Sequence, residues 1–224
     1  MEIRTTMDKH IDITIDFETC SLSANAAVIT MAALPWKRDD EEVPFYNKKV
    51  LEPFRGYVDL RSCVVEGFDF DPETIDWWSR QNDYAKDALL KGAAVPVKEM
   101  LLNFMKWLKR TMDATGAETV CLWCQGMDVD IAILRNICRK FGFNLNSIVA
   151  HTYFRDCRTV ILERAISMAK SQYVKFSAQD IMQKPSLAYQ MFEPLPESLQ
   201  DIGDVHDAMF DCIRSTWYTW QAIR

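Results

Sequence analysis

The sequence predicts one α/β domain, residues 1–224, with a mixed β-sheet flanked by α-helices on both faces. Two observations predict this class. Short apolar, β-branched runs fill the first third of the chain, and helical patterns alternate with such runs afterwards. The length of 224 residues and the hydrophobic content of 49% suit one such domain with a sizeable core.

The first strand is predicted over residues 11–19, because apolar and polar residues alternate from Ile11 to Phe17. Residues 26–34 form a more continuous apolar run, typical of a buried strand, and Pro35 closes it. Further strands are predicted over residues 43–50, 56–60, 119–124 and 148–154, the first two in an antiparallel meander.

Helices are predicted from their start signals and their apolar stripes. Asp71, Pro72 and Glu73 open one of them as an N-cap, a first-turn proline and a first-turn acid. Further helices are predicted over residues 84–90, 97–112, 128–141, 156 to about 169, and 204–223. Residues 172–203 are predicted as a short helix and a surface loop.

Charge and cysteine content exclude some classes of protein. A net charge of −6 argues against a broad basic face that coats long nucleic acid, but permits an enzyme that grips a few nucleotides through metal ions. Seven scattered cysteines, an odd count, fit reduced thiols. No apolar run is long enough to span a bilayer, and residues 1–10 lack the apolar core of a signal peptide, so we expect a cytoplasmic protein.

The first strand carries two acids on one face. Asp16 and Glu18 are two residues apart, so both side chains project to the same side while Phe17 faces the other. Carboxylates held this close repel each other unless a cation lies between them, and hard divalent cations prefer such oxygen ligands. The pattern therefore fits half of a metal site; it also fits a half-exposed strand with two solvated acids.

Two later segments place further acids at helix starts. Asp130 follows the turn after the 119–124 strand, and His206 precedes Asp211 by five residues at the start of the last helix. Each pattern alone has an ordinary explanation, because acids near helix starts stabilise the helix dipole.

Taken in order, these residues resemble the signature of the DEDDh 3′→5′ exonucleases. The resemblance rests on Asp16, Glu18, Asp130, His206 and Asp211. Two more segments resemble one subgroup of that family: residues 77–81 match a Trp-Trp-x-x-Gln helix, and residues 156–159 match an Asp-x-Arg-Thr motif. The subgroup contains RNase AS-type exoribonucleases and phage exonuclease A-like enzymes. The resemblance is therefore compatible with a phage-encoded protein that acts in the host cytoplasm.

The resemblance implies an RNase H-like fold and a two-metal mechanism. Asp16, Glu18, Asp130 and Asp211 are expected to hold two Mg²⁺ or Mn²⁺ ions, which in such sites lie about 3.5–4 Å apart. His206 is expected to be the general base, since imidazole titrates near neutral pH. All five residues are thus expected to be catalytic, and the product would be a nucleoside 5′-monophosphate.

Four residues are expected to contact the substrate. By analogy with the family, Thr19 and Leu22 approach the 3′-terminal nucleotide. Of Trp77 and Trp78, one is expected in the core and the other against a base; Trp78 is the one assigned to the substrate. Arg158 is expected to bind a phosphate, or else to pair with an acid near the site.

The predicted function is a metal-dependent 3′→5′ exonuclease acting on single-stranded DNA ends, with activity on RNA as well. An exoribonuclease of the RNase AS type is the alternative within the family, and such enzymes can be homodimers. Two rivals come from other classes. One is a non-catalytic nucleic-acid-binding module on the same fold, and the other is a thiol redox protein built on Cys121 and Cys124, whose spacing lies inside a strand run.

Overall fold

A computed structural model describes residues 10–47, 49–171, 175–200 and 206–224. Across these residues a six-stranded sheet has the order β4-β3-β2-β1-β5-β6. The strands are β1 (His10–Thr19), β2 (Val28–Trp36), β3 (Phe54–Val58), β4 (Ala94–Val95), β5 (Thr119–Cys124) and β6 (Phe154–Asp156). β2 is antiparallel to β1 and β3, whereas β5 is parallel to β1 and β6. The prediction of a mixed sheet is confirmed.

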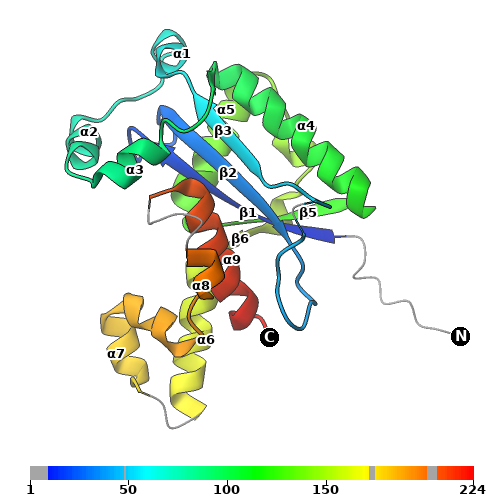
Figure 1. Cartoon of the computed structure of the whole chain (residues 1–224), viewed down its shortest axis with the longest axis vertical. Coiled ribbons are helices and arrows are strands. Elements are labelled where there is room, and N and C mark those ends of the chain that lie inside the picture. The colour runs from blue at the N-terminus through cyan, green and yellow to red at the C-terminus, as the bar shows by residue number, and fades with distance from the viewer. Residues whose placement is uncertain (1–9, 48, 172–174, 201–205) are drawn as a thin grey trace, which may run out of the picture.

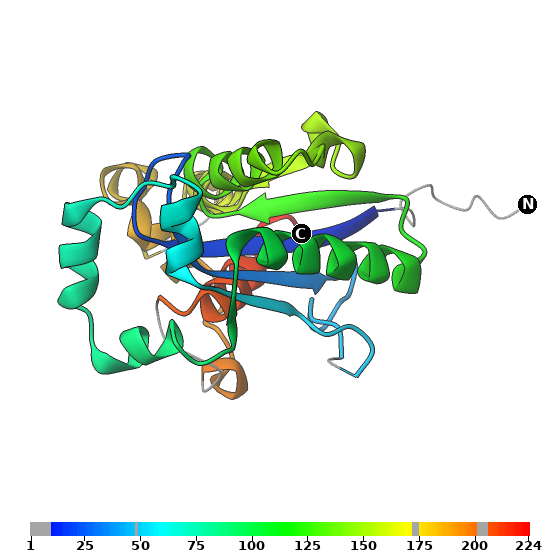
Figure 2. The ribbon, with the colours of Figure 1, turned by 90° about the horizontal axis from the view of Figure 1, so that it is seen from above.

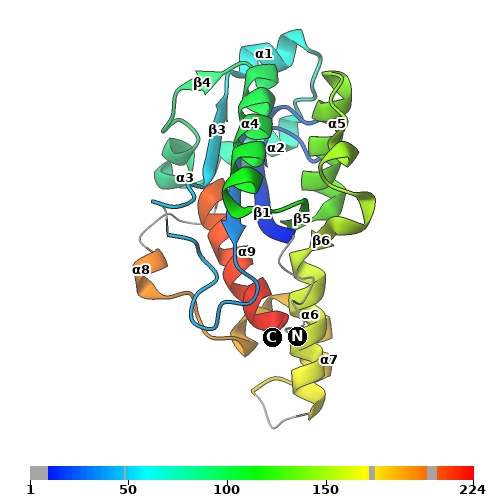
Figure 3. The same cartoon turned by 90° about the vertical axis from the view of Figure 1, so that its right-hand side faces the viewer.

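Helices cover both faces of the sheet, as predicted (Figures 1 and 3). The isoleucines of β1 pack into a core with α4 (Val97–Thr115) and α5 (Ala132–Lys140). The opposite face of the sheet packs against α6 (Cys157–Ser171) and α9 (Ala208–Ala222). On that face the Thr216 hydroxyl bonds the Thr14 hydroxyl at 2.8 Å, which ties α9 to the middle of β1.

Three short helices lie between β3 and β4: α1 (Leu60–Val65), α2 (Pro72–Ser79) and α3 (Asp83–Ala88). Figure 2 shows them at one end of the sheet, opposite the end from which the N-terminus extends. The Asp71 carboxylate accepts a hydrogen bond from the Thr74 amide at 2.9 Å, which confirms the predicted cap of α2.

The remaining helices are short. They are a π-helical turn (Met127–Ile131), three 3₁₀ turns (Leu145–Ser147, His151–Tyr153 and Pro185–Met191), α7 (Ala178–Gln183) and α8 (Glu197–Gln200). Within the described ranges, no helix combines the length and the apolar character needed to cross a membrane.

Two predicted strands are wrong. In the described part of residues 43–50 only Phe45 makes a β-bridge, to Trp36, because Pro44 has no amide to donate and Asn47 folds the chain into a turn. Residues 148–153 enclose a 3₁₀ turn, and β6 begins only at Phe154. Val149 is fully buried in this segment. Its apolar side chain therefore packs in the core although the segment is not a strand.

Some predicted boundaries also change. The strand predicted over residues 56–60 begins at Phe54 and ends at Val58, because Asp59 accepts the Arg61 amide and caps α1. The helix predicted over residues 128–141 begins as the π-helical turn. The last helix starts at Ala208, since Asp207 caps it; Asp204, its predicted start, lies outside the described residues.

Candidate active site

The C-terminal end of β1 places two carboxylates on the face that packs against α9. Asp16 and Glu18 lie on this face, and the pairing of β1 with β2 shifts register just after Glu18. Glu18 is opposite Thr30 whereas Thr19 is opposite Val28, so β2 holds an extra residue at this point. Such bulges increase the local twist and re-aim side chains beside functional sites.

The π-helical turn after β5 supplies the third carboxylate. Asp130 is buried at 6% exposure, and its amide bonds the Gly126 carbonyl at 2.9 Å. Hydrogen bonds from the backbone of Phe17 and Gln125 reach its carboxylate, which places the turn against β1. One-turn π-helices of this kind occur frequently at functional sites.

The start of α9 supplies the remaining two groups. Asp211 lies in the first turn of the helix, and its Oδ2 accepts the His206 amide at 3.0 Å. Candidate ligand atoms of Glu18, His206 and Asp211 all lie within 4.8 Å of one another. His206 has a φ of 73°, a left-handed conformation that costs a non-glycine residue free energy and persists mainly where function requires it.

Burial raises the pKa of all four carboxylates. Burial raises the pKa of Asp16 well above its ordinary value, and the charges of Asp130, Glu18 and Asp211 raise it further. Burial, then the charges of Asp211 and Asp130, raises the pKa of Glu18 to about 8. Burial raises the pKa of Asp130 to about 7 and also raises that of Asp211. The single ion pair to this group among the described residues is from Arg214, whose Nη2 lies 2.8 Å from Asp211 Oδ1.

This donor set fits divalent cations. It consists of carboxylate oxygens, the ligands that suit Mg²⁺ and Mn²⁺, and one imidazole lies beside them. Arg214 makes the single ion pair to these carboxylates among the described residues, and bound cations would supply further positive charge.

The electrostatics predict a pH-dependent stability for the metal-free protein. Glu18 has an ordinary pKa of 4.5 and a folded-state pKa of about 8, so between these values the folded chain holds more protons than the unfolded chain. The free energy of unfolding should therefore fall as pH rises from 4.5 to 8, by on the order of a few kcal/mol. Urea denaturation in EDTA at several pH values measures it, and Glu18→Gln should flatten the dependence. An unchanged slope in this variant would contradict the prediction.

A cleft of about 470 Å³ adjoins the carboxylates. We call it the terminal cleft; its walls include Glu18, Thr19, Leu22, Trp77, Trp78 and Val129. Three of the four predicted substrate contacts, Thr19, Leu22 and Trp78, thus lie together. Leu22 is 72% exposed at the rim, where it is free to contact a ligand.

The two adjacent tryptophans differ in role. Trp78 is buried, and its Nε1 donates to the Thr19 carbonyl at 2.9 Å, which fixes the end of β1. Trp77 is 37% exposed, and its ring meets the His206 ring edge-on at 4.7 Å between centroids. The sequence-based prediction assigned Trp78 to the substrate, but Trp77 offers the more accessible ring. The positions of the two residues in the helix pattern did not indicate which one is buried.

Arg158 does not line the terminal cleft. It is exposed near the start of α6, and no hydrogen bond or ion pair joins its guanidinium to another described residue. Its charge nevertheless lowers the pKa of Asp130, which places it near the carboxylates. The alternative of a salt bridge to a nearby acid is absent among the described residues.

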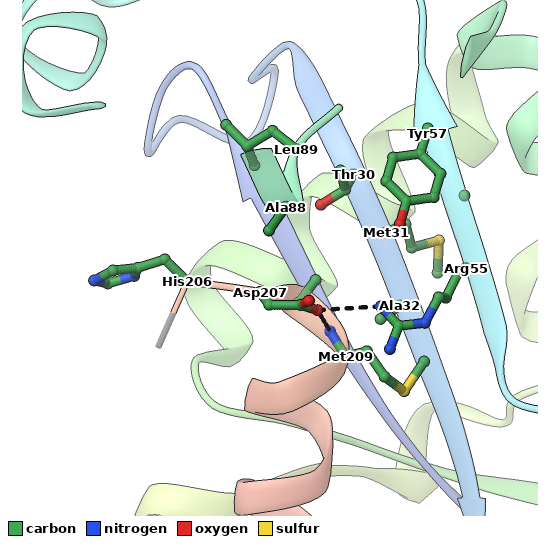
Figure 4. A pocket seen from close by; sticks show the side chains of 12 residues that line it. Thr30, Met31, Ala32, Arg55, Tyr57, Ala88, Leu89, His206, Asp207 and Met209 are labelled. Atoms are coloured by element: carbon green, nitrogen blue, oxygen red, sulfur yellow. Dashed lines mark hydrogen bonds and ion pairs between the residues drawn. The ribbon is translucent and has the colours of Figure 1, made fainter. Parts of the chain in front are cut away.

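Asp207 anchors the segment that carries His206 (Figure 4). It is buried, accepts the Met209 amide at 2.9 Å, and accepts Arg55 Nη1 of β3 at 3.2 Å, while Lys91 Nζ lies 4.0 Å away. The His206 side chain points away from this pair (Figure 4). Arg55 thus fixes the residue next to His206. Sequence reasoning missed this contact, which joins residues 152 positions apart.

Replacing Arg55 by glutamine should lower kcat roughly tenfold with little change in KM, because Asp207 would lose its partner and His206 its position. Arg55→Lys should recover part of the activity. Steady-state kinetics on a labelled oligonucleotide measure both values. Arg61→Gln is the matched control, since Arg61 is exposed and pairs only with Asp59 among the described residues. A rise in KM alone would indicate that Arg55 contacts substrate directly.

The two cysteines of the redox alternative are buried in β5. Burial raises the pKa of both Cys121 and Cys124, which disfavours the thiolate that redox chemistry requires. All seven cysteines lie in the described ranges as free thiols, as expected.

Comparison with known proteins agrees with this geometry. Residues 11–187 match the family model described as the 3′-5′ exoribonuclease Rv2179c-like domain. An exodeoxyribonuclease of Enterobacteria phage T4 is 24% identical over 220 residues, which cover 95% of this chain and 89% of that protein.

Two solved structures of E. coli exonuclease I share the fold. A zinc-bound complex with single-stranded DNA has a TM-score of 0.58 and 12% identity, covering 92% of this chain. A complex with a 5cy-dA13 oligonucleotide has a TM-score of 0.54 and 14% identity, covering 96% of this chain. This chain spans only 39% and 41% of those longer chains. The likeness confirms the RNase H-like α/β fold.

The fold and the match together define the class, a 3′→5′ exonuclease of the DEDDh type. Within that class, the chain belongs to the 3′-5′ exoribonuclease Rv2179c-like family. The matched residues end before His206 and Asp211, which the structure brings to the same site from α9.

Proposed function

We propose that this protein removes nucleoside 5′-monophosphates from the 3′ ends of single-stranded DNA, and of RNA as well, with two Mg²⁺ or Mn²⁺ ions. The observation that carries the proposal is the cluster of three buried carboxylates, Glu18, Asp130 and Asp211, and the half-buried Asp16, with His206 beside a cleft of nucleoside size. Clefts that bind small ligands are commonly about 300–1,000 Å³.

Each group has a part in hydrolysis. Asp16, Glu18, Asp130 and Asp211 would hold the cations, which when bound stabilise phosphoryl charge and lower the pKa of water. His206 takes the proton of the attacking water, and its backbone bond to Asp211 keeps the imidazole beside the carboxylates. Thr19, Leu22 and the tryptophan pair contact the terminal nucleoside, with Trp77 presenting the accessible ring.

The relatives favour different nucleic acids. The phage T4 relative is named an exodeoxyribonuclease, and both structural neighbours are complexes with DNA oligonucleotides, which supports DNA. The family description names an exoribonuclease, which supports RNA-specific hydrolysis as the second candidate.

A direct degradation assay separates these candidates. Single-stranded DNA and RNA of one sequence, labelled at the 5′ end, would be incubated with Mg²⁺, with Mn²⁺ and with EDTA. A ladder that shortens from the 3′ end only with metal supports the proposal, and the faster substrate identifies the preferred nucleic acid. Binding without cleavage under every metal condition would overturn it in favour of a non-catalytic binding module.

A further inference from the structure

A second cavity lies beside α6 and shares no lining residue with the terminal cleft. It has a volume of about 360 Å³, and its walls come from α6 and the Pro185–Met191 turn. We call it the upstream pocket, defined by Arg158, Leu162, Ala188 and Tyr189 with Ser186 at its rim. Figure 1 shows α2, which lines the terminal cleft, on one side of the start of α9, and α6 and α7 on the other.

Arg158 joins the upstream pocket to the carboxylates. A Cβ atom on Gly126 would lie 3.6 Å from Arg158 Nη2, so the guanidinium rests against the turn that carries Asp130. Tyr189 lies within the electrostatic reach of Arg158 and of Arg214, the partner of Asp211. The edge of the pocket at Arg158 therefore lies next to the turn that carries Asp130.

The pocket has the chemistry of a nucleotide site. Leu162, Ala188 and Pro185 supply apolar walls, and the Tyr189 ring supplies a face on which a base can stack. The Tyr189 ring is held edge-on against Tyr218 at 5.1 Å between centroids, so it is already positioned. The guanidinium of Arg158 at the pocket edge, which has no hydrogen-bond or ion-pair partner among the described residues, is suited to a phosphate.

Other basic groups near the site are paired with acids. Arg55 and Lys91 both face the buried carboxylate of Asp207. Arg158 has no such partner among the described residues, in a chain whose net charge is −6. The Arg158 guanidinium, which makes no ion pair with a described residue, is therefore available to an anionic strand on the α6 side.

We propose that the upstream pocket binds a base of the retained strand, on the 5′ side of the scissile phosphate, with Arg158 on the adjoining phosphate. The proposal rests on the proposed exonuclease function. It predicts that the enzyme binds at least two nucleotides, one in each cavity. Blocking the upstream pocket should weaken the binding of strands and leave the rate of the chemical step unchanged.

The test compares two substrates. The p-nitrophenyl ester of thymidine 5′-monophosphate fills the terminal cleft and has no upstream nucleotide, whereas a DNA decanucleotide has both parts. Ser186→Trp inserts a large ring at the exposed rim of the pocket. It should raise KM for the decanucleotide at least tenfold and leave kcat/KM for the ester within about twofold. Met182→Trp is the matched control, because Met182 is 66% exposed on α7 and does not line the pocket.

A second variant tests the phosphate contact. Arg158→Gln should also raise KM for the decanucleotide, and its binding should depend less steeply on salt than that of the unmodified protein. If the ester is turned over too slowly, inhibition by thymidine 5′-monophosphate replaces it, and the Ser186→Trp variant should leave the inhibition constant unchanged.

The outcomes distinguish a failure of the upstream pocket from a failure of the exonuclease function. Equal losses on both substrates, or no loss on the decanucleotide, would overturn the upstream pocket while the exonuclease function stands. Failure of the unmodified protein to cleave either substrate with Mg²⁺ or Mn²⁺ would overturn the exonuclease function, and the upstream pocket with it.

Discussion

Replacement of Asp16 by asparagine is expected to abolish nucleolytic activity while leaving the fold intact. Asp16 is enclosed among Glu18, Asp130 and Asp211, so its loss removes a charge that the cations require. We expect kcat to fall by at least about 10²–10³-fold, the loss typical of removing one charge-stabilising group. The fold should survive, because the variant removes repulsion from a cluster whose members raise one another's pKa.

Asp128 offers a matched control for this experiment. It is an exposed acid two residues before the buried Asp130, and it lies in the same π-helical turn. Asp128→Asn should keep activity within about twofold, whereas Asp130→Asn should behave like Asp16→Asn. Degradation rates and thermal unfolding in EDTA measure the two effects separately. A fully active Asp16→Asn protein would remove the carboxylate cluster from the mechanism.

Replacement of His206 by alanine is expected to lower kcat by roughly 10²–10⁴-fold, the usual contribution of a general base. The ring lies against Trp77 and beside the candidate ligand atoms of Glu18 and Asp211, where it can accept a proton from the attacking water. The residual activity should rise with hydroxide concentration, because solvent base then removes the proton. A pH–rate profile measures this change.

His151 provides the control for the histidine experiment. It is exposed on the short turn before β6, and its replacement by alanine should leave both kcat and the pH–rate profile unchanged. If His206→Ala retained the profile of the unmodified protein, another group would have to act as the base. Metal-free thermal unfolding of both variants shows whether the fold is preserved.

The sequence predicted the parts of the site that depend on local pattern. Alternation along β1 placed Asp16 and Glu18 on one face, and the helical pattern placed Asp211 in the last helix, although that helix begins at Ala208 and leaves His206 outside it. These features follow from strand and helix geometry alone. The burial of the carboxylates and their shared pKa shifts required the tertiary structure.

Long-range packing explains what the sequence could not predict. The pairing of Arg55 with Asp207 joins distant segments, and no local pattern marks either residue as a partner. The assignment of residues 43–50 to a strand failed because Pro44 and Asn47 outweighed the apolar content of the run. By contrast, the ion pair between Arg214 and Asp211 could have been predicted from the sequence. Arg214 lies three positions after Asp211 on one helix, and side chains at this spacing are neighbours.

The insertion that carries α1, α2 and α3 has a consequence for how this enzyme can evolve. It leaves the sheet after β3 and returns through β4, which pairs with β3 at only two positions, Tyr57 with Ala94 and Val58 with Val95. The acids come from other segments: β1, the turn after β5, and α9. Mutations in this segment can therefore reshape one wall of the terminal cleft without replacing an acid, provided that they spare Trp77 and Trp78, which contact His206 and the end of β1.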